Sequence, residues 1–313
     1  MKYIGKKLIT MIITVLIVTL LVFLAFSVIP GDPALNMLGI NATPEKVERL
    51  REQLGLNRPL VVRYFEWIFS FAFGDMGKSY SYGTAVRDMI GNKVPITLTL
   101  SIMAFIIILV LSIPVGIYTA KHEDKWYSKA VDVINQLFMS IPPFFIGILL
   151  TFFFGLVLRC FTPGGYVSYS NDLFGFIKYL FFPALAIAIP KIAMTVKLLK
   201  SSLLKESKLD YVRTAYSRGN STNEVLYKHV LKNAIIPVVT FLGMTLADIV
   251  AGSLIIEQVF SIPGIGRLLI TSISNRDYPV VQSIIAIVAI IVIVVNFCVD
   301  ILYKVIDPRL RGK

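Results

Sequence analysis

Two cysteines and two histidines are all that this 313-residue sequence contains of the side chains that most often hold metal ions or form redox pairs. Cys160 and Cys298 lie far apart, beside or within apolar runs, without the close spacing of a metal site or a redox motif. We interpret both cysteines as inert packing residues. The sequence therefore predicts neither a cofactor nor a metal site in this chain.

Charged residues are also scarce, at 16% of the chain, whereas 56% of the residues are hydrophobic. A soluble domain needs more polar surface to cover its core, so this composition predicts a membrane protein. The net charge of +12 is of a size found in nucleic-acid-binding proteins, but here the basic residues flank apolar runs, where they orient membrane proteins. We therefore expect membrane lipid around the chain and no nucleic-acid partner.

The first apolar stretch begins close to the N-terminus. It runs without a charge over residues 8–31, whereas the apolar core of a secretory signal peptide spans about 7–15 residues. We expect a retained first membrane span rather than a cleaved leader.

A helix needs about 20 apolar residues to cross a bilayer, because its backbone groups must be satisfied internally. Six segments meet this requirement, so the sequence predicts an all-α integral membrane protein with six transmembrane helices. Prolines at positions 142, 143, 183 and 190 are expected to interrupt the third and fourth of them. The six predicted spans are residues 8–28, 96–120, 133–158, 177–199, 235–256 and 278–299.

Lysine and arginine are distributed unevenly among the loops. They gather at the N-terminus, in residues 121–129, in residues 197–232 and in the tail from Lys304, and are sparse in the short alternate loops. The positive-inside rule then predicts a multi-pass protein with both termini in the cytoplasm. Residues 30–95 would lie outside.

The outer segment is itself predicted to be structured. Thr43 is suited to cap a helix that has Pro44 at its first position, and Gly55 is suited to end it. Aromatic residues follow over positions 64–73, which is typical of a segment at the membrane interface.

Residues 72–79 read AFGDMGKS and fit a relaxed phosphate-loop pattern. A phosphate loop joins a buried strand to a helix and normally opens with glycine, where this sequence has Ala72. An aromatic run precedes the segment and the predicted topology places it outside the cell. We therefore expect no nucleotide site here.

Residues 209–237 form a polar, basic segment between two apolar ones. The sequence predicts one helix from Ser201 to Arg218 that ends at Gly219, and a second that starts at Ser221 with Glu224 completing a capping box. A solvated loop that only fixes topology is the alternative. The regular apolar positions within the segment favour a helix pair that docks into another protein.

At this point the chain resembles the permease subunits of binding-protein-dependent ABC importers, in the oligopeptide, dipeptide and nickel branch. In that family the so-called EAA motif of a cytoplasmic loop inserts a short helix into a groove of the ATPase subunit. The general Glu-Ala-Ala is Arg213-Thr214-Ala215 here, and the usual proline falls at Lys232. The residues that carry the resemblance are Asp210-Tyr211-Val212-Arg213-Thr214-Ala215, Gly219, His229, Leu231, Asn233, Ala234 and Pro237.

Further matches follow one another in order along nearly the whole chain, and they reclassify the AFGDMGKS segment as the branch's Gly-Asp-x-Gly-x-Ser signature. They include Pro30-Gly31-Asp32-Pro33, Gly55-Leu56, Gly74-Asp75-Met76-Gly77-Lys78-Ser79, Pro95-Ile96-Thr97-Leu98, Glu257-Gln258-Val259-Phe260, Pro263-Gly264-Ile265-Gly266, Arg276-Asp277-Tyr278-Pro279 and Asp307-Pro308-Arg309.

The resemblance implies a type I ABC importer permease fold in a bacterial or archaeal cell membrane. It implies a first helix within residues 1–29, an extracytoplasmic region over 30–95, and a five-helix permease core over 96–313 with a coupling loop at 200–235. The implied partners are a second homologous permease, two ATPase subunits and an extracytoplasmic binding protein. ATP and Mg²⁺ would be bound by the ATPases, so this chain would be no enzyme. The implied ATPase-coupling residues are Asp210, Tyr211, Arg213, Thr214, Ala215, Arg218, Gly219, Lys228 and Leu231.

Asp248 lies about twelve residues into the fifth span, roughly 18 Å at 1.5 Å per residue. A lone carboxylate there is costly unless it is paired, hydrated or protonated. Two interpretations stay open: a hydrogen bond to a neighbouring helix or to the partner permease, or a place on the translocation path. Lys191 is expected to extend its ammonium group toward the cytoplasmic interface.

The resemblance favours peptides as substrate, and nickel or another chelated metal is the alternative. The only histidines, His122 and His229, both fall on the predicted cytoplasmic side. An ion-coupled secondary transporter with Asp248 and Lys191 as a charge relay is a more remote alternative, because no inverted repeat is visible. A membrane scaffold or channel is a further one.

Overall fold

The computed structural model describes residues 2–28, 33–39 and 42–306, and this part of the chain is helical almost throughout. The predicted matches at 30–32 and 307–309 lie outside the described residues. The chain divides into two compact units. Unit 1 comprises Met1–Thr97 with Pro263–Phe297, and unit 2 comprises Leu98–Ile262 with Cys298–Lys313.

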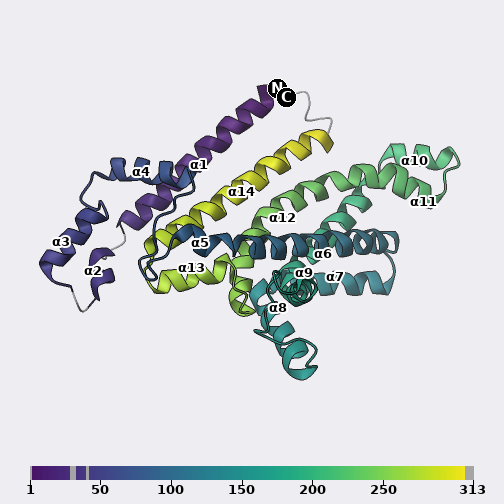
Figure 1. Ribbon diagram of the computed structural model, residues 1–313. Coiled ribbons are helices and arrows are strands. Elements are labelled where there is room, and N and C mark those ends of the chain that lie inside the picture. Colours follow the sequence, from purple (N-terminus) through teal and green to yellow (C-terminus); the bar gives the residue numbers. More distant parts are fainter. Residues whose placement is uncertain (1, 29–32, 40–41, 307–313) are drawn as a thin grey trace. The chain divides into compact units, whose positions relative to one another are not determined.

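Figure 1 follows the helices along the chain by colour. Two of them, α6 and α14, pass from one unit to the other. Unit 1 holds α1 (Lys2–Val28), α2 (Pro33–Leu38), α3 (Pro44–Gln53), α4 (Leu60–Ala72), α5 (Val86–Gly91), α13 (Ile265–Ser274) and most of α14 (Tyr278–Ile306). Unit 2 holds most of α6 (Val94–Lys121), then α7 (Trp126–Ser140), α8 (Pro143–Leu150), the π-helical η2 (Thr151–Val157), α9 (Leu173–Glu206), α10 (Asp210–Ser217), α11 (Thr222–Glu224), the π-helical η3 (Val225–Val230) and α12 (Leu231–Val259).

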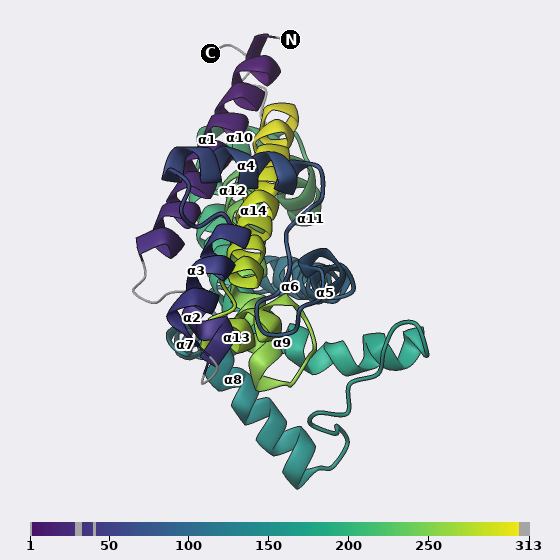
Figure 2. The ribbon, with the colours of Figure 1, turned by 60° about the vertical axis from the view of Figure 1, so that its left-hand side comes forward.

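Five helices in the described residues are long and apolar enough to cross a membrane, or six if the bent pair α7 and α8 forms one span. The predicted third span, 133–158, is therefore not one straight helix. The chain bends by 105° between α7 and α8–η2, where Ile141 and Pro142 both have extended backbone. A residue before proline disfavours helical geometry, so the Pro142–Pro143 pair breaks the helix. In Figure 2, the chain runs from α8 through η2 to the bottom of the view and then returns to α9.

The prolines of the fourth span have a different outcome. Helix α9 continues through Pro183 and Pro190, so the predicted interruption there is wrong. Both residues are buried, and neighbouring elements help a membrane helix to tolerate a missing backbone hydrogen bond.

Helix α9 is the centre of unit 2, where it packs against α7, α8 and α12. Its buried residues include Leu180, Leu199 and Leu203. The Tyr179 hydroxyl donates a hydrogen bond of 2.6 Å to the carbonyl oxygen of Phe260 at the end of α12. A Cβ atom at Gly147 of α8 would lie 3.0 Å from the Phe260 ring, so glycine allows this close approach.

In unit 1, α1 and α4 are joined by aromatic packing and a polar contact. Tyr64 packs its ring against Phe23 at 5.6 Å, and its hydroxyl lies 3.1 Å from the hydroxyl of Thr19. Helix α3 begins at Pro44 as predicted, but the Thr43 side chain at its N-cap makes no capping hydrogen bond. Gly55, with φ +65, turns the chain just after α3 as predicted.

Candidate functional site

The coupling segment, residues 207–230, follows the end of α9. The predicted single helix 201–218 is wrong, because α9 ends at Glu206 and α10 begins only at Asp210. Leu209 between them is extended, with φ −79 and ψ 151. Asp210 then stands in the first turn of α10, where a carboxylate is favoured by the helix dipole. The break gives α10 a direction that is independent of α9.

The corner between α10 and α11 has the chemistry that the sequence predicts. Gly219 has φ +82, a conformation that costs a side-chain-bearing residue energy. No atom lies within 4 Å of the position that a Cβ would take there. The backbone conformation alone therefore requires glycine.

The capping box that starts α11 is also confirmed. The Ser221 hydroxyl accepts from the Glu224 amide, while the Glu224 carboxylate accepts from the Ser221 amide at 3.1 Å. Lys228 donates to the same carboxylate group at 3.1 Å. The Ser221 amide, and then the Lys228 ammonium, lower the pKa of Glu224.

Apolar side chains hold the two short helices in place. Val212 and Ala215 of α10 and Val225 and Val230 of η3 are all buried. Tyr211 adds a polar tie, because its hydroxyl donates to Glu206 at 2.7 Å and accepts from Asn233 at 3.1 Å. Burial raises the pKa of the Tyr211 hydroxyl.

The remaining predicted coupling residues divide into exposed and packed groups. The Asp210 and Arg213 side chains are 97% and 82% exposed and form a loose ion pair of 3.7 Å. Ala215 is buried and Leu231 is half-buried at the start of α12, so these two stabilise the segment from within. The exposed residues of the coupling segment are Ser207, Lys208, Leu209, Asp210, Tyr211, Arg213, Thr214, Tyr216, Ser217, Arg218, Gly219, Ser221, Thr222, Asn223, Tyr227 and Lys228.

Asp248 is paired within its own chain. Its carboxylate accepts from Lys191 of α9 at 2.8 Å, and the side chains of Lys191 and Asp248 are 20% and 64% exposed. The Lys191 ammonium therefore extends to α12. The pair joins the middles of two long helices and leaves most of the carboxylate uncovered.

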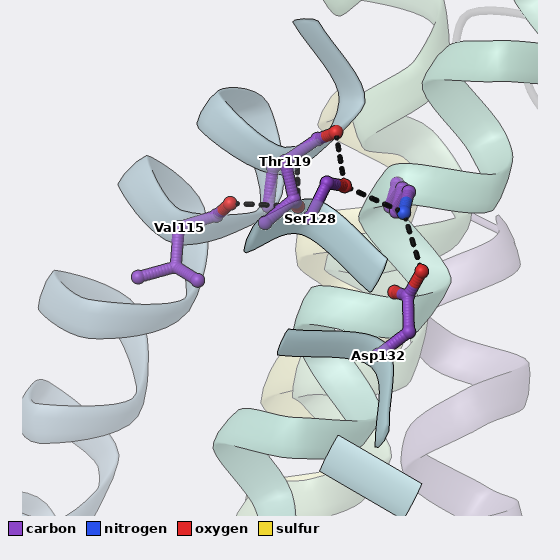
Figure 3. Close-up of polar contacts among 6 residues, drawn as sticks. Val115, Thr119, Ser128 and Asp132 are labelled. Atoms are coloured by element: carbon purple, nitrogen blue, oxygen red, sulfur yellow. Dashed lines mark hydrogen bonds and ion pairs between the residues drawn. The ribbon is translucent and has the colours of Figure 1, made fainter. Parts of the chain in front are cut away.

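Sequence reasoning missed a second ion pair on α9. The Lys200 ammonium donates to Asp132 of α7 at 2.6 Å and to the buried Ser128 at 2.9 Å. Ser128 in turn donates to the carbonyl oxygen of Thr119 at the end of α6. Figure 3 shows this chain of contacts, with Val115 accepting from the Thr119 hydroxyl. A regular three- or four-residue spacing on one helix would have signalled such a pair, but these partners come from separate helices.

The AFGDMGKS segment of unit 1 forms a tight turn beside Asp277. Asp277 is fully buried and accepts from the Ser79 hydroxyl at 2.5 Å and from the amides of Tyr80 and Ser81. An isolated antiparallel β-bridge pairs Lys78 with Ala85, and helix α4 precedes the segment. A phosphate loop follows a buried strand, whereas a helix precedes this segment. The residues of the signature instead belong to a turn that hydrogen bonds to Asp277 hold in place.

The described residues contain no group of three or more histidine, cysteine, aspartate or glutamate side chains placed to hold a metal ion.

Two protein-family models match successive parts of the chain. Residues 112–312 match the inner membrane component of binding-protein-dependent transport systems, and residues 1–101 match the N-terminal part of such membrane components. The chain belongs to this permease family.

The permease has relatives that match it over almost its whole length. A Brucella abortus protein provisionally named as a peptide transport system permease is 36% identical over 306 residues, covering 98% of both chains. The oligopeptide transport system permease protein AppB of Bacillus subtilis is 33% identical over 312 residues, covering 99% of both. The glutathione transport system permease protein GsiC of Escherichia coli is 34% identical over 313 residues, covering 100% of both. The predicted resemblance to the peptide branch is confirmed.

The larger family match covers the coupling segment and both α9 ion pairs of the permease. Asp277 also lies within it, whereas its partner Ser79 lies within the N-terminal match. The hydrogen bond between Ser79 and Asp277 in unit 1 therefore joins residues from the two matched regions.

Proposed function

We propose that this permease and a second, homologous permease form the translocation path of an ATP-driven importer. Two separate ATPase subunits would bind the cytoplasmic side and an extracytoplasmic binding protein would deliver the substrate. The proposal rests on family membership, together with one structural observation: the coupling segment is held by buried apolar residues while most of its polar residues stay exposed.

The coupling segment is proposed to insert into a groove of the ATPase. Its exposed face combines tyrosines and cations, as at many protein interfaces, and Gly219 sets the angle between its helices. ATP-driven closure of the two ATPases would move the docked segments, and the attached α9 and α12 would tip between inward and outward openings. Hydrolysis would take place in the ATPases.

We propose peptides as the substrate class, because the relatives' names assign them to peptides, oligopeptides, dipeptides and glutathione. Nickel or another chelated metal is the alternative within the same architecture. Transport assays with the cognate binding protein that compare labelled peptides with nickel separate the two.

Asp248 is proposed to line the path. A carboxylate that is 64% exposed in the middle of a membrane helix is costly against lipid, so its open side belongs against water, substrate or the second permease. Lys191 would hold the carboxylate by their ion pair while the path is empty. A peptide's amino terminus could then exchange with the Lys191 ammonium.

Both termini are proposed to be cytoplasmic, with residues 30–95 outside and residues 96–313 forming the permease core. Single cysteines introduced at positions 46 and 216 of a cysteine-free variant, labelled from one side of sealed vesicles, test this sidedness.

The central experiment is purification of the tagged permease from its native membrane, followed by reconstitution. We expect two ATPase subunits and a second permease to co-purify, and ATP hydrolysis to rise when loaded binding protein is added. A lone permease that transports peptide in response to an ion gradient without ATP would contradict the proposal.

A further inference from the structure

An open cavity of about 760 Å³ lies between α7 and the end of α9 and reaches Lys208 at the start of the coupling segment, while Asp248 does not line it. Four lysines line it against two acidic residues. The remaining lining is mostly polar. The residues are Glu123, Asp132, Asn135, Gln136, Lys197, Lys200, Ser201, Leu204, Lys205 and Lys208.

The lysines gather there because of their spacing. Lys197 and Lys200 stand on one face of α9, since helix residues three or four positions apart are neighbours, and Lys205 lines the same cavity about two turns beyond Lys197. Lys208 follows just after the helix ends. Lys200 is committed to Asp132, and Lys197 donates to Gln136 at 3.0 Å. Lys205 and Lys208 are exposed and leave an excess of positive charge.

A second observation indicates that the cavity suits a ligand with hydrogen-bond acceptors. Asn135 is 6% exposed, and its amide nitrogen has no hydrogen-bond partner in the part of the chain that the structure describes. An unsatisfied buried donor is unfavourable. An anionic oxygen in the cavity would provide an acceptor for Asn135 after a small side-chain rotation, and would also accept from the lysines.

The surroundings favour a lipid as the source of that oxygen. On α7, Val133 and Leu137 stand beside the lining residues and are 62% and 60% exposed. Trp126 at the start of α7 is 78% exposed, and tryptophan is enriched at the level of lipid headgroups. An acyl chain could lie along Val133 and Leu137 while its phosphate enters the cavity.

We propose that this cavity binds an anionic phosphate group, supplied by the headgroup of an acidic phospholipid. Basic pockets between membrane helices are known to take such headgroups. The bound phosphate would link α7 to α9 and so stabilise the end of α9 from which the coupling segment departs. A free phosphate ion offers the same chemistry without the acyl chains.

The test uses the full-length permease and its reconstituted complex in nanodiscs. Phosphatidylglycerol is titrated against a phosphatidylcholine background, and bound lipid is counted by native mass spectrometry. The variant Lys197→Gln/Lys205→Gln/Lys208→Gln removes three cavity charges but keeps the Lys200–Asp132 pair. The control, Lys125→Gln/Lys129→Gln/Lys232→Gln, removes three exposed lysines that do not line the cavity.

We expect the cavity variant to bind phosphatidylglycerol at least about tenfold more weakly, since it removes three of the positive charges that attract an anionic headgroup. The control should stay within about twofold of the unchanged permease. Asn135→Leu, which removes a donor and no charge, should weaken phosphatidylglycerol binding several-fold.

Inorganic phosphate distinguishes the two sources. Millimolar phosphate is tested in two measurements: displacement of phosphatidylglycerol from mixed nanodiscs, and a rise in Tm in nanodiscs of phosphatidylcholine alone. If phosphate does both for the unchanged permease but does not raise the Tm of the cavity variant, the cavity binds free phosphate. If phosphate does neither while phosphatidylglycerol still distinguishes cavity variant from control, the headgroup is the source. Equal loss of phosphatidylglycerol binding in the cavity variant and the control would overturn the proposal.

Discussion

The turn at residues 74–83 and the coupling segment at 207–230 both contain left-handed glycines and polar residues, yet an aspartate in each has the opposite environment. At the 74–83 turn, the fully buried Asp277 accepts from one hydroxyl and two backbone amides. In the coupling segment, the Asp210 side chain is 97% exposed. Asp277 is satisfied by groups of the protein, whereas Asp210 is open to water or a partner.

This difference distinguishes a structural tie from a binding surface. A buried carboxylate is stable only when hydrogen bonds replace water, so Asp277 fixes the position of the turn around Ser79. The exposed groups of the coupling segment add little to the stability of the chain on its own. The Lys191–Asp248 pair is intermediate, because its lysine is mostly covered and its carboxylate mostly open.

Asp277→Ala should have the largest effect on stability. It removes the acceptor of the Ser79 hydroxyl and of the Tyr80 and Ser81 amides, and hydrogen bonds to a charged group contribute about 1.5–3 kcal/mol. We expect a loss of about 3 kcal/mol, seen as a lower Tm in detergent and as faster hydrogen exchange in residues 79–83.

The matched control is Asp75→Ala in the same turn. Asp75 is exposed and, among the described residues, its side chain accepts from the Gly77 amide alone, so its loss should cost less than about 1 kcal/mol. Equal Tm values for the two variants would show that Asp277 does not fix the turn.

Gly219→Val should break the coupling segment without unfolding the chain. Its φ of +82 would cost a β-branched residue about 1 kcal/mol or more, and relief of that strain would turn α10 away from α11. We expect normal membrane insertion but no rise in ATP hydrolysis when substrate and binding protein are added to the complex.

Gly219→Asn is the control, because asparagine tolerates the left-handed region better than valine and the space around the position is empty. It should retain most of the stimulated hydrolysis. Full stimulation in the valine variant would rule out a required angle at this corner.

Asp248→Asn tests whether an open charge in the membrane serves transport. The amide keeps the size of the side chain and an acceptor for Lys191, while the negative charge is lost. On the path interpretation, assembly and basal hydrolysis persist and peptide uptake falls by about tenfold, since about 1.4 kcal/mol of attraction is lost. Radiolabelled peptide uptake into proteoliposomes measures it.

Asp248→Leu completes that test. If Asn leaves uptake intact while Leu prevents assembly, then Asp248 is a packing hydrogen-bond partner and not part of the path.

The sequence predicted those features that depend on neighbouring residues. Apolar runs gave the spans, Ser221 with Glu224 gave a helix start, and Gly219 gave a left-handed corner, because each rests on local chemistry. The direction of a span was harder to predict. A straight helix and one that bends at Pro142 can have the same number of apolar residues.

Contacts between distant residues could not be predicted in this way. Asp132 and Lys200 are 68 residues apart, and Asp277 is 198 residues from Ser79. Such pairs depend on how helices are rotated against one another, which hydropathy does not determine. The signature that ends at Ser79 was identified from the sequence, but only the structure shows that its hydroxyl donates to Asp277. The break between α9 and α10 at Leu209 could not be predicted either, because residues 207–209 contain no glycine or proline.

Arg213→Ala/Arg218→Ala/Lys228→Ala should weaken assembly with the ATPases to a moderate extent. Each cation is exposed, and exposed pairs contribute about 0.2–1 kcal/mol each, so we expect about a tenfold loss of affinity in total at low salt. Titration of purified ATPase onto permease nanodiscs measures it. Affinity equal to that of the unchanged permease, with orientation preserved, would show that these cations only fix topology.

Glu224→Gln should have the smallest effect and should depend on pH. Glutamine can keep the capping bond to the Ser221 amide, so the comparison isolates the charge that pairs with Lys228. The pKa of Glu224 is lowered in the folded chain by the Ser221 amide and then by Lys228. Its charge therefore stabilises the segment at pH values above the ordinary pKa of 4.5, and the contribution is lost as the pH falls through the lowered pKa.

Hydrogen exchange of residues 222–225, corrected for intrinsic rates, should be slower in the unchanged permease than in the variant at pH 7. The two should converge below pH 4.5. A difference that persists undiminished to pH 2 would mean that the charge of Glu224 does not hold this corner.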